Sequence, residues 1–184
     1  MKDAFPEIWL VRRLNDKVTT LMGNHATPPA VVESLQHHRF AHFVCHGILE
    51  REKPFQASFK LSNGLRLTLL EIVRSRLPDA EFAFLSTCHT AELTEGSIAD
   101  EGLHLTVAVQ YCGFRSVVGT MWAMADEDGG DLAGHFYKSM FSSNDASVPY
   151  YERSARSLRD AVRSLRRKKG LPIERWVNFV HYGA

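Results

Sequence analysis

The sequence predicts an α/β fold with a mainly parallel central sheet. Two short runs, Ala41–Cys45 and Phe82–Leu85, are strongly apolar and end at small or polar residues, as buried parallel strands do. Helical segments separate these and the later strands. Strands that alternate with helices form βαβ units, whose right-handed crossovers cover both faces of a sheet. Because no internal repeat or linker is present, we expect one domain over residues 1–184.

The segment before the first of these strands predicts a helix, a strand and a second helix. Residues 8–16 are weakly helical, and Val18–Met22 reads as a short strand. Thr27 is a suitable N-cap for a helix with Pro28 at its first position, where the missing amide hydrogen costs nothing. That helix should end at the basic cluster His37–Arg39.

Between the two apolar strands, the sequence predicts a hairpin and a short helix. Residues 58–67 alternate around Asn63-Gly64, which is the strongest short signal for a β-hairpin. Thr68 and Glu71 have the spacing of a capping box, in which each side chain bonds to the backbone of the other. We expect this box to open a helix over Leu69–Arg76.

The second half of the chain predicts three helices and two strands. Asp100 and Asp126 stand where N-cap residues are expected. The elements are, in order, a polar loop His89–Gly96, a helix Glu101–Tyr111, a strand Phe114–Trp122, a helix from Asp126, a loop Ser142–Pro149, a helix Glu152–Lys169 and a strand Trp176–His181.

Composition predicts a soluble cytoplasmic protein. Of the 184 residues 45% are hydrophobic, enough for a sizeable core. With 22 basic and 21 acidic residues the net charge is +1, so no global field favours nucleic acid or an anionic membrane. Three cysteines without close pairing argue against a disulfide framework and favour a reducing compartment. No apolar stretch reaches the length of a membrane span, and the N-terminus lacks the apolar core of a signal peptide.

Two reactive side chains follow the two apolar runs. His46 stands just after the first run and Cys88 just after the second, so both should emerge at the carboxyl rim of the sheet. A thiol beside an imidazole is a working nucleophile, because the base lowers the thiol pKa and shuttles protons. Gly47 lets backbone approach a ligand closely. Cys45 and Cys112 lie in apolar contexts and are expected to be structural. This pattern predicts a cysteine peptidase.

A zinc site is the competing interpretation of the same cluster. Zinc sites normally show local ligand pairs such as Cys-x-x-Cys, or His-x-x-x-His on a helix. His38, His42 and His46 do recur every fourth residue, but Phe40–Val44 reads as a strand and not as a helix. We therefore favour the peptidase and expect no metal and no organic cofactor. The side chains that would serve as ligands are His42, Cys45, His46, Cys88 and His89.

Two charged segments have both a simple and a functional interpretation. Asp126–Asp128 is either a solvated helix N-terminus, where acidic residues are favourable, or the floor of a pocket for a basic side chain. Glu152–Lys169 carries eight basic and two acidic residues. A solvated helix face is favoured there, because a nucleic-acid surface would need interleaved aromatic residues.

At these residues the chain resembles the CHAT family of caspase-like peptidases, relatives of caspases, separase and gingipains. The segment His42–Gly47 is similar to the family's histidine motif, and Leu85–Ala91 to its cysteine motif. Asp100–Leu105 resembles the start of the helix that follows. Gly113–Trp122 and Asp126–Asp128 are similar to the family's next strand and acidic turn. The amino-acid sequences of these motifs are similar to those of many CHAT proteins of mushroom-forming fungi.

The resemblance extends over roughly Val18–Gly183 and implies a fold and a context. The fold is a caspase-like three-layer αβα sandwich. Family domains commonly carry more sequence before Lys17, so we expect this chain to be the C-terminal part of a larger protein with a helical-repeat regulatory region.

The resemblance also implies an endopeptidase mechanism. Cys88 attacks the scissile carbonyl, His46 acts as general acid–base, and the N–H groups of Gly47 and Cys88 form the oxyanion hole. A protein or peptide substrate lies extended beside the strand around Thr120 and Trp122.

Asp126 would then recognise a basic residue before the cut, with Arg favoured over Lys. The alternatives are a catalytically silent interaction module and a metal-dependent or acyl-transferring enzyme.

Overall fold

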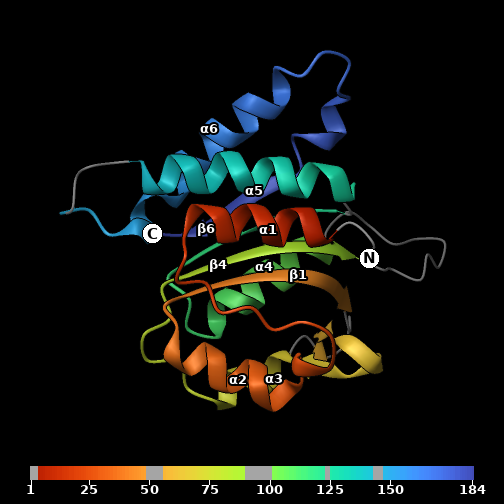
Figure 1. Cartoon of the computed structure of the whole chain (residues 1–184), viewed down its shortest axis with the longest axis vertical. Helices are drawn as coiled ribbons and strands as arrows, with labels where there is room; N and C mark the ends of the chain where they lie inside the picture. Colours follow the sequence, from red (N-terminus) through yellow and green to blue (C-terminus); the bar gives the residue numbers. More distant parts are fainter. Residues whose placement is uncertain (1–3, 49–55, 90–100, 123–124, 143–146) are drawn as a thin grey trace.

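The computed structural model describes residues 4–48, 56–89, 101–122, 125–142 and 147–184, and of residues 4–5, 87–89, 101–104 and 126–127 the backbone alone. Its elements form three layers, with a six-stranded sheet between two layers of helices (Figure 1). The predicted fold class, an αβα sandwich, is confirmed.

The sheet has a parallel centre and antiparallel edges. Its strand order is β3-β2-β1-β4-β5-β6. β1 is parallel to β4, and β4 is parallel to β5, whereas the other neighbours are antiparallel. The strands are β1 (Phe40–Ile48), β2 (Ser58–Lys60), β3 (Arg66–Thr68), β4 (Phe82–His89), β5 (Ser116–Thr120) and β6 (Phe179–Gly183).

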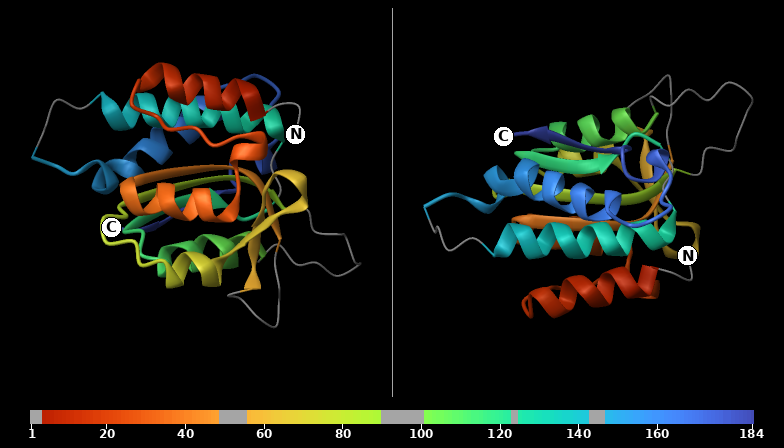
Figure 2. Two further views of the ribbon diagram at one scale, coloured as in Figure 1. Left: turned by 60° about the horizontal axis from the view of Figure 1, so that its bottom comes forward. Right: turned by 90° about the horizontal axis from the view of Figure 1, so that it is seen from above.

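Three helices cover each face of the sheet, as the turned views show (Figure 2). The first face carries α1 (Ala4–Leu14), α5 (Asp126–Phe141) and α6 (Ser154–Arg166). The second carries α2 (Pro28–His37), α3 (Leu69–Arg74) and α4 (Glu101–Tyr111). Among the residues that the structure describes, no helix is both long enough and apolar enough to cross a membrane.

The hydrophobic core consists of two clusters, one on each face of the sheet. Phe82 of β4 stacks on Phe136 of α5, with ring centroids 5.4 Å apart. On the opposite face Phe43 of β1 stacks on Phe59 of β2 at 4.4 Å. Because successive residues of a strand point to opposite faces, β4 supplies both clusters and is buried on both sides.

The local signals in the sequence are confirmed. The Thr27 hydroxyl accepts the Ala30 N–H at the start of α2. Both bonds of the capping box between Thr68 and Glu71 are present. Asn63 has a φ of 58° and the following glycine 74°, the left-handed conformation that this turn between β2 and β3 requires. Short 3₁₀ segments are η1 (Gly23–His25), η3 (Ser62–Gly64), η4 (Tyr150–Arg153) and η5 (Ile173–Arg175).

Some predicted elements differ from the structure. Val18–Met22 is not a strand, because it pairs with no neighbour, and its Thr19 hydroxyl bonds instead to His38. Ala125, not Asp126, is the N-cap of α5. The predicted last helix begins as η4 and continues as α6. The predicted cap Asp100 and most of the preceding loop lie outside the described residues.

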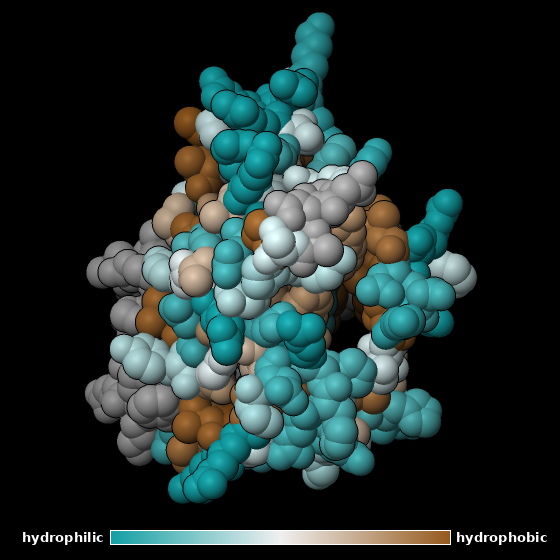
Figure 3. All heavy atoms as spheres, turned by 90° about the vertical axis from the view of Figure 1, so that its left-hand side faces the viewer, coloured by the Kyte–Doolittle hydropathy of each residue, from teal (hydrophilic) through white to brown (hydrophobic). Residues whose placement is uncertain are grey.

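The basic helix α6 presents its charges to solvent. Its inner face packs Leu158, Ala161 and Leu165 into the core. Arg156 and Arg163 are exposed on the outer face. The end of the molecule that α6 forms is largely hydrophilic (Figure 3). This arrangement matches a solvated face, the interpretation that the sequence favoured.

Candidate active site

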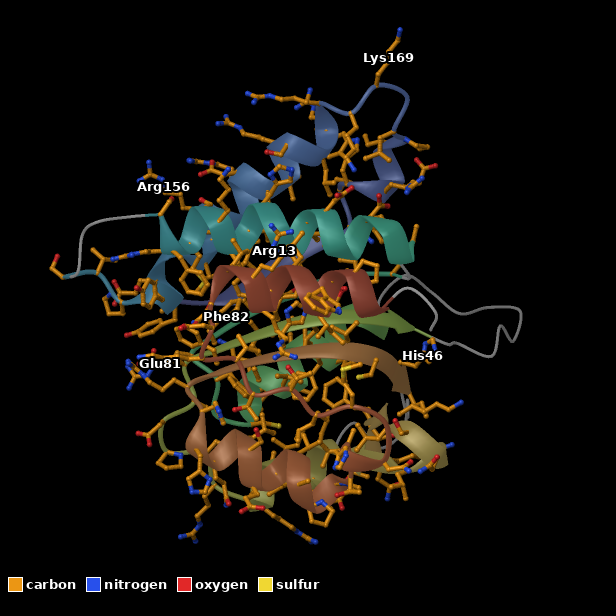
Figure 4. The ribbon with its side chains drawn as sticks, viewed as in Figure 1. Arg13, His46, Glu81, Phe82, Arg156 and Lys169 are labelled. Carbon is orange, nitrogen blue, oxygen red and sulfur yellow. The ribbon has the colours of Figure 1, made fainter. Side chains whose placement is uncertain are left out.

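His46 lies at the carboxyl end of β1. In Figure 4 it stands at the opposite end of the sheet from Glu81 and Phe82, which mark the start of β4. In an open sheet with parallel strands, ligands bind outside the carboxyl ends of those strands. His46 is therefore on the rim where the chemistry of such a fold is expected.

The strand register brings His46 and Cys88 together. β1 and β4 pair in parallel from Phe40 with Phe82 up to Gly47 with His89, and within this ladder His46 is the partner of Cys88. Neighbouring strands lie about 4.8 Å apart, so the two backbones are direct neighbours. The prediction that these residues stand at the carboxyl ends of adjacent parallel strands is confirmed. The side chain of Cys88 lies outside the described residues.

The imidazole of His46 has an unused nitrogen. Its Nδ1 is buried and has no hydrogen-bond partner among the residues that the structure describes. An unsatisfied buried nitrogen costs free energy unless a partner reaches it. The ladder places residue 88 beside this histidine, so a thiol proton is a suitable partner for Nδ1.

The other two cysteines are in structural surroundings. The Cys112 thiol is buried and donates to the carbonyl oxygen of Ala108 at 3.3 Å. Burial raises the pKa of Cys112 to about 12. Cys45 is partly buried and packs against the core cluster on the second face. These environments support the prediction that Cys45 and Cys112 are structural.

Gly47 lies inside the sheet. β1 continues to Ile48, three residues beyond its predicted end. Gly47 is buried and stands in register with Phe59 of β2 on one side and His89 of β4 on the other. Its backbone is thus held by two strands beside the dyad.

One edge of β5 near the predicted substrate site is already occupied. β6 pairs antiparallel with β5 up to Thr120 and Phe179, and the Met121 N–H donates to the Asn178 carbonyl at 2.8 Å. A peptide cannot add to that edge. The register between β4 and β5 ends at Phe84 and Val118, although β4 continues to His89.

The predicted substrate-binding side chains are in three different situations. Thr120 is buried, and its hydroxyl has no hydrogen-bond partner in the described part of the chain. The Trp122 indole N–H donates to the Glu174 carbonyl at 3.2 Å. Asp126 is the first residue of α5, and its side chain is outside the described residues. A side-chain role for Thr120 in substrate binding is thus disfavoured by its burial.

Arg175 is a residue that sequence reasoning missed. Asp128 is only 2% exposed, and Arg175 donates to both of its carboxylate oxygens, at 2.7 and 2.8 Å. The interpretation of the whole acidic turn as solvated is wrong for Asp128. Because 47 residues separate the partners, no local pattern indicates this pair.

Glu7 is a second missed residue. It lies on the buried face of α1, accepts hydrogen bonds from Ser86 and His42, and belongs to no motif. His42, one of the potential zinc ligands, is thereby engaged elsewhere. Over the described ranges, no group of three or more His, Cys, Asp or Glu residues is arranged to hold a metal ion.

Comparison with known proteins assigns the family. The family model of the CHAT domain matches residues 4–184. Among curated proteins, no significant match to the chain is found. The match spans the three-layer fold and both rim segments, the one ending at His46 and the one ending at Cys88. The chain therefore belongs to the CHAT domain family.

Proposed function

We propose that this protein is a cysteine endopeptidase that cleaves a protein partner with a Cys88/His46 dyad. The register pair of these residues at the carboxyl rim carries the proposal. The buried Nδ1 of His46, which has no partner among the described residues, supports it, because a base beside the thiol must have a nitrogen to accept the proton.

The proposed reaction has two halves. His46 takes the thiol proton, the Cys88 thiolate attacks the scissile carbonyl carbon, and the C–N bond breaks as the imidazolium returns the proton to the leaving amine. A water molecule then attacks the thioester, with His46 again accepting the proton. The carboxylic acid leaves and the thiol is restored, so atoms and protons balance without a cofactor.

We further propose that the N–H groups of Gly47 and Cys88 stabilise the oxyanion of the tetrahedral intermediate. Gly47 directly follows His46 at the rim, which supports this position, and the proposal requires that the strand ladders leave its N–H free. One such donor typically contributes about 3–4 kcal/mol to transition-state stabilisation. The test is binding of a peptide aldehyde, whose hemithioacetal oxygen should occupy the same site.

A reactive Cys88 should be distinguishable from the other thiols. We expect brief iodoacetamide treatment at pH 8 to alkylate Cys88 fastest, Cys45 more slowly and Cys112 last. With a pKa of about 12, only about one Cys112 thiol in 10,000 is ionised at that pH.

Mass spectrometry of the three peptides measures this order. A tagged thiol probe, run with Cys88→Ala and with a chelator, adds the control. Labelling that a chelator abolishes would instead support the metal-dependent alternative.

Asp126 is the proposed specificity residue. Its neighbour Asp128 is already paired with Arg175, so it has no free charge to offer a substrate. Asp126 is the first residue of α5, two residues before Asp128, and a carboxylate there would form a bidentate pair with a substrate Arg. A neutral substrate would leave that charge partly desolvated and unpaired.

Asp126→Asn should lower kcat/KM for substrates with Arg or Lys before the cut by about tenfold or more, and leave Cys88 alkylation unchanged. The matched control is Asp79→Asn, because Asp79 is exposed and precedes β4, whose first residue lies at the opposite end of the sheet from His46 (Figure 4). A peptide library measures the preference. A wild-type preference for apolar or acidic residues at this position would overturn the assignment of Asp126 and leave the dyad intact.

A further inference from the structure

A buried polar cluster lies behind the dyad and has no part in the proposed reaction. The carboxylate of Glu7 accepts from His42 Nε2 at 3.0 Å and from the Ser86 hydroxyl at 2.9 Å. The Tyr137 hydroxyl lies 3.1 Å from the other ring nitrogen of His42. Glu7 is only 3% exposed, and Ser86 only 2%. Four elements, α1, β1, β4 and α5, therefore meet in this cluster.

The hydrogen bonds of this cluster are mutually satisfied. A carboxylate only accepts, so both Ser86 and His42 donate to Glu7. Burial, and secondly the negative charge of Glu7, raises the pKa of Tyr137 well above its ordinary value. The phenol keeps its proton and can donate to His42 Nδ1. A network of this kind fixes the side chains that take part in it.

The two strands that Glu7 holds are the two strands that carry the dyad. Ser86 precedes Cys88 by two residues on β4, about 7 Å along the strand, and His42 precedes His46 by four residues on β1, about 13 Å. One carboxylate thus bonds to both strands, on the side of the sheet that α1 covers, just behind the rim.

Close packing of α1 on α5 brings Glu7 within reach of the sheet. A Cβ built on Gly130 of α5 would lie 3.8 Å from the Cα and Cβ atoms of Glu7. A Cβ on Gly134 would lie 2.8 Å from the end of the Leu10 side chain. The two glycines, one turn apart, leave the room that α1 occupies. Contacts with α5 at the position of Glu7 therefore limit how closely α1 can approach the sheet.

We propose that Glu7 is a positioning residue for the dyad: by bonding to Ser86 and His42 it holds the ends of β4 and β1 in the geometry that Cys88 and His46 need. The inference rests on the proposed function. Without the carboxylate, the donors of Ser86 and His42 lose their acceptor in a buried place and must rearrange. A displacement of about 1 Å at a reacting centre can cost about 100-fold in rate.

The first test is Glu7→Gln, which keeps the size of the side chain and replaces one acceptor by a donor. We expect kcat for the best library peptide to fall about 10–100-fold with KM within about twofold. Alkylation of Cys88 at neutral pH should slow by about fivefold or more, and its pH profile should shift toward that of an unassisted thiol. Glu33→Gln, at an exposed position of α2, is the control and should change neither quantity.

The second test leaves every side chain of the cluster in place. Gly130→Leu would push α1 away at Glu7, whereas Gly130→Ala fits, because its Cβ meets only ordinary contacts. We expect the leucine variant to reproduce the losses of Glu7→Gln within about threefold and the alanine variant to behave as wild type. Equal activity of the two variants would contradict the claim that the close packing of α1 on α5 holds Glu7 in place.

The two hypotheses fail in different ways. If Glu7→Gln only lowers the melting temperature, with kcat per folded molecule and the Cys88 alkylation profile unchanged, Glu7 is structural and the positioning role is wrong. If the wild-type protein cleaves no peptide, the proposed function fails. The alkylation profiles then decide the role of Glu7 by themselves, and identical profiles in wild type and Glu7→Gln overturn it.

Discussion

Cys88→Ala is expected to abolish peptide cleavage, and His46→Gln to lower kcat by about 10²–10⁴-fold, the usual contribution of a general acid–base. The reason is the register pair at the carboxyl rim, because Cys45 lies on the opposite face of β1 from His46 and Cys112 is buried in the core. Initial rates on the best peptide from a library measure both variants.

Each dyad variant has a matched control. Cys45→Ala removes a thiol one residue before His46, on the opposite face of β1, and His135→Gln alters an exposed histidine of α5. Both should retain wild-type rates within about twofold. Cleavage that survives in Cys88→Ala would overturn the dyad. A wild-type protein whose Cys88 reacts with thiol probes but which cleaves no library peptide would instead support the silent interaction module.

Arg175→Leu is expected to destabilise the fold by about 3 kcal/mol, because it leaves the Asp128 carboxylate buried without its partner. The estimate is at the low end for a buried pair, since the Arg175 side chain is 31% exposed while that of Asp128 is 2% exposed. For a domain of this size the melting temperature should fall by about 6–12 °C. Thermal unfolding followed by circular dichroism measures the shift.

Two further variants isolate the cause. Arg159→Leu breaks an exposed pair with Asp160, whose side chains are 53% and 38% exposed, and should cost less than about 1 kcal/mol. Adding Asp128→Asn to Arg175→Leu removes the unpaired charge and should restore part of the loss. Equal destabilisation by Arg175→Leu and Arg159→Leu would show that burial of Asp128 is not the cause.

The two residues at the carboxyl rim could be predicted because the sequence signals that mark them are local. Apolar runs that stop at His46 and Cys88 mark strand ends, and the rule that parallel strands present their carboxyl ends together needs no distance information. Caps and turns were predictable for the same reason. The capping box of Thr68 and Glu71 and the turn at Asn63-Gly64 depend on atoms within four residues of each other.

The edge of β5 could not be predicted in this way. The sequence shows a last strand, but not that β6 returns antiparallel and occupies one side of β5, the strand beside which a substrate was expected. The direction of a strand depends on the path of the preceding helices, and here α5 and α6 both precede it on one face.

The sequence by itself determined the alternation of strands and helices, the caps, the hairpin and the two reactive positions His46 and Cys88. Only the tertiary structure decided that these two positions are register partners on adjacent strands. It also decided that Arg175 forms an ion pair with Asp128, and that Glu7 accepts a hydrogen bond from Ser86, 79 residues away. The physical reason is the range of the forces involved. Sterics and capping bonds act within a helical turn. The partner of a buried charge is instead set by how closely α1 and α5 pack on the sheet, which here requires a small residue at position 130.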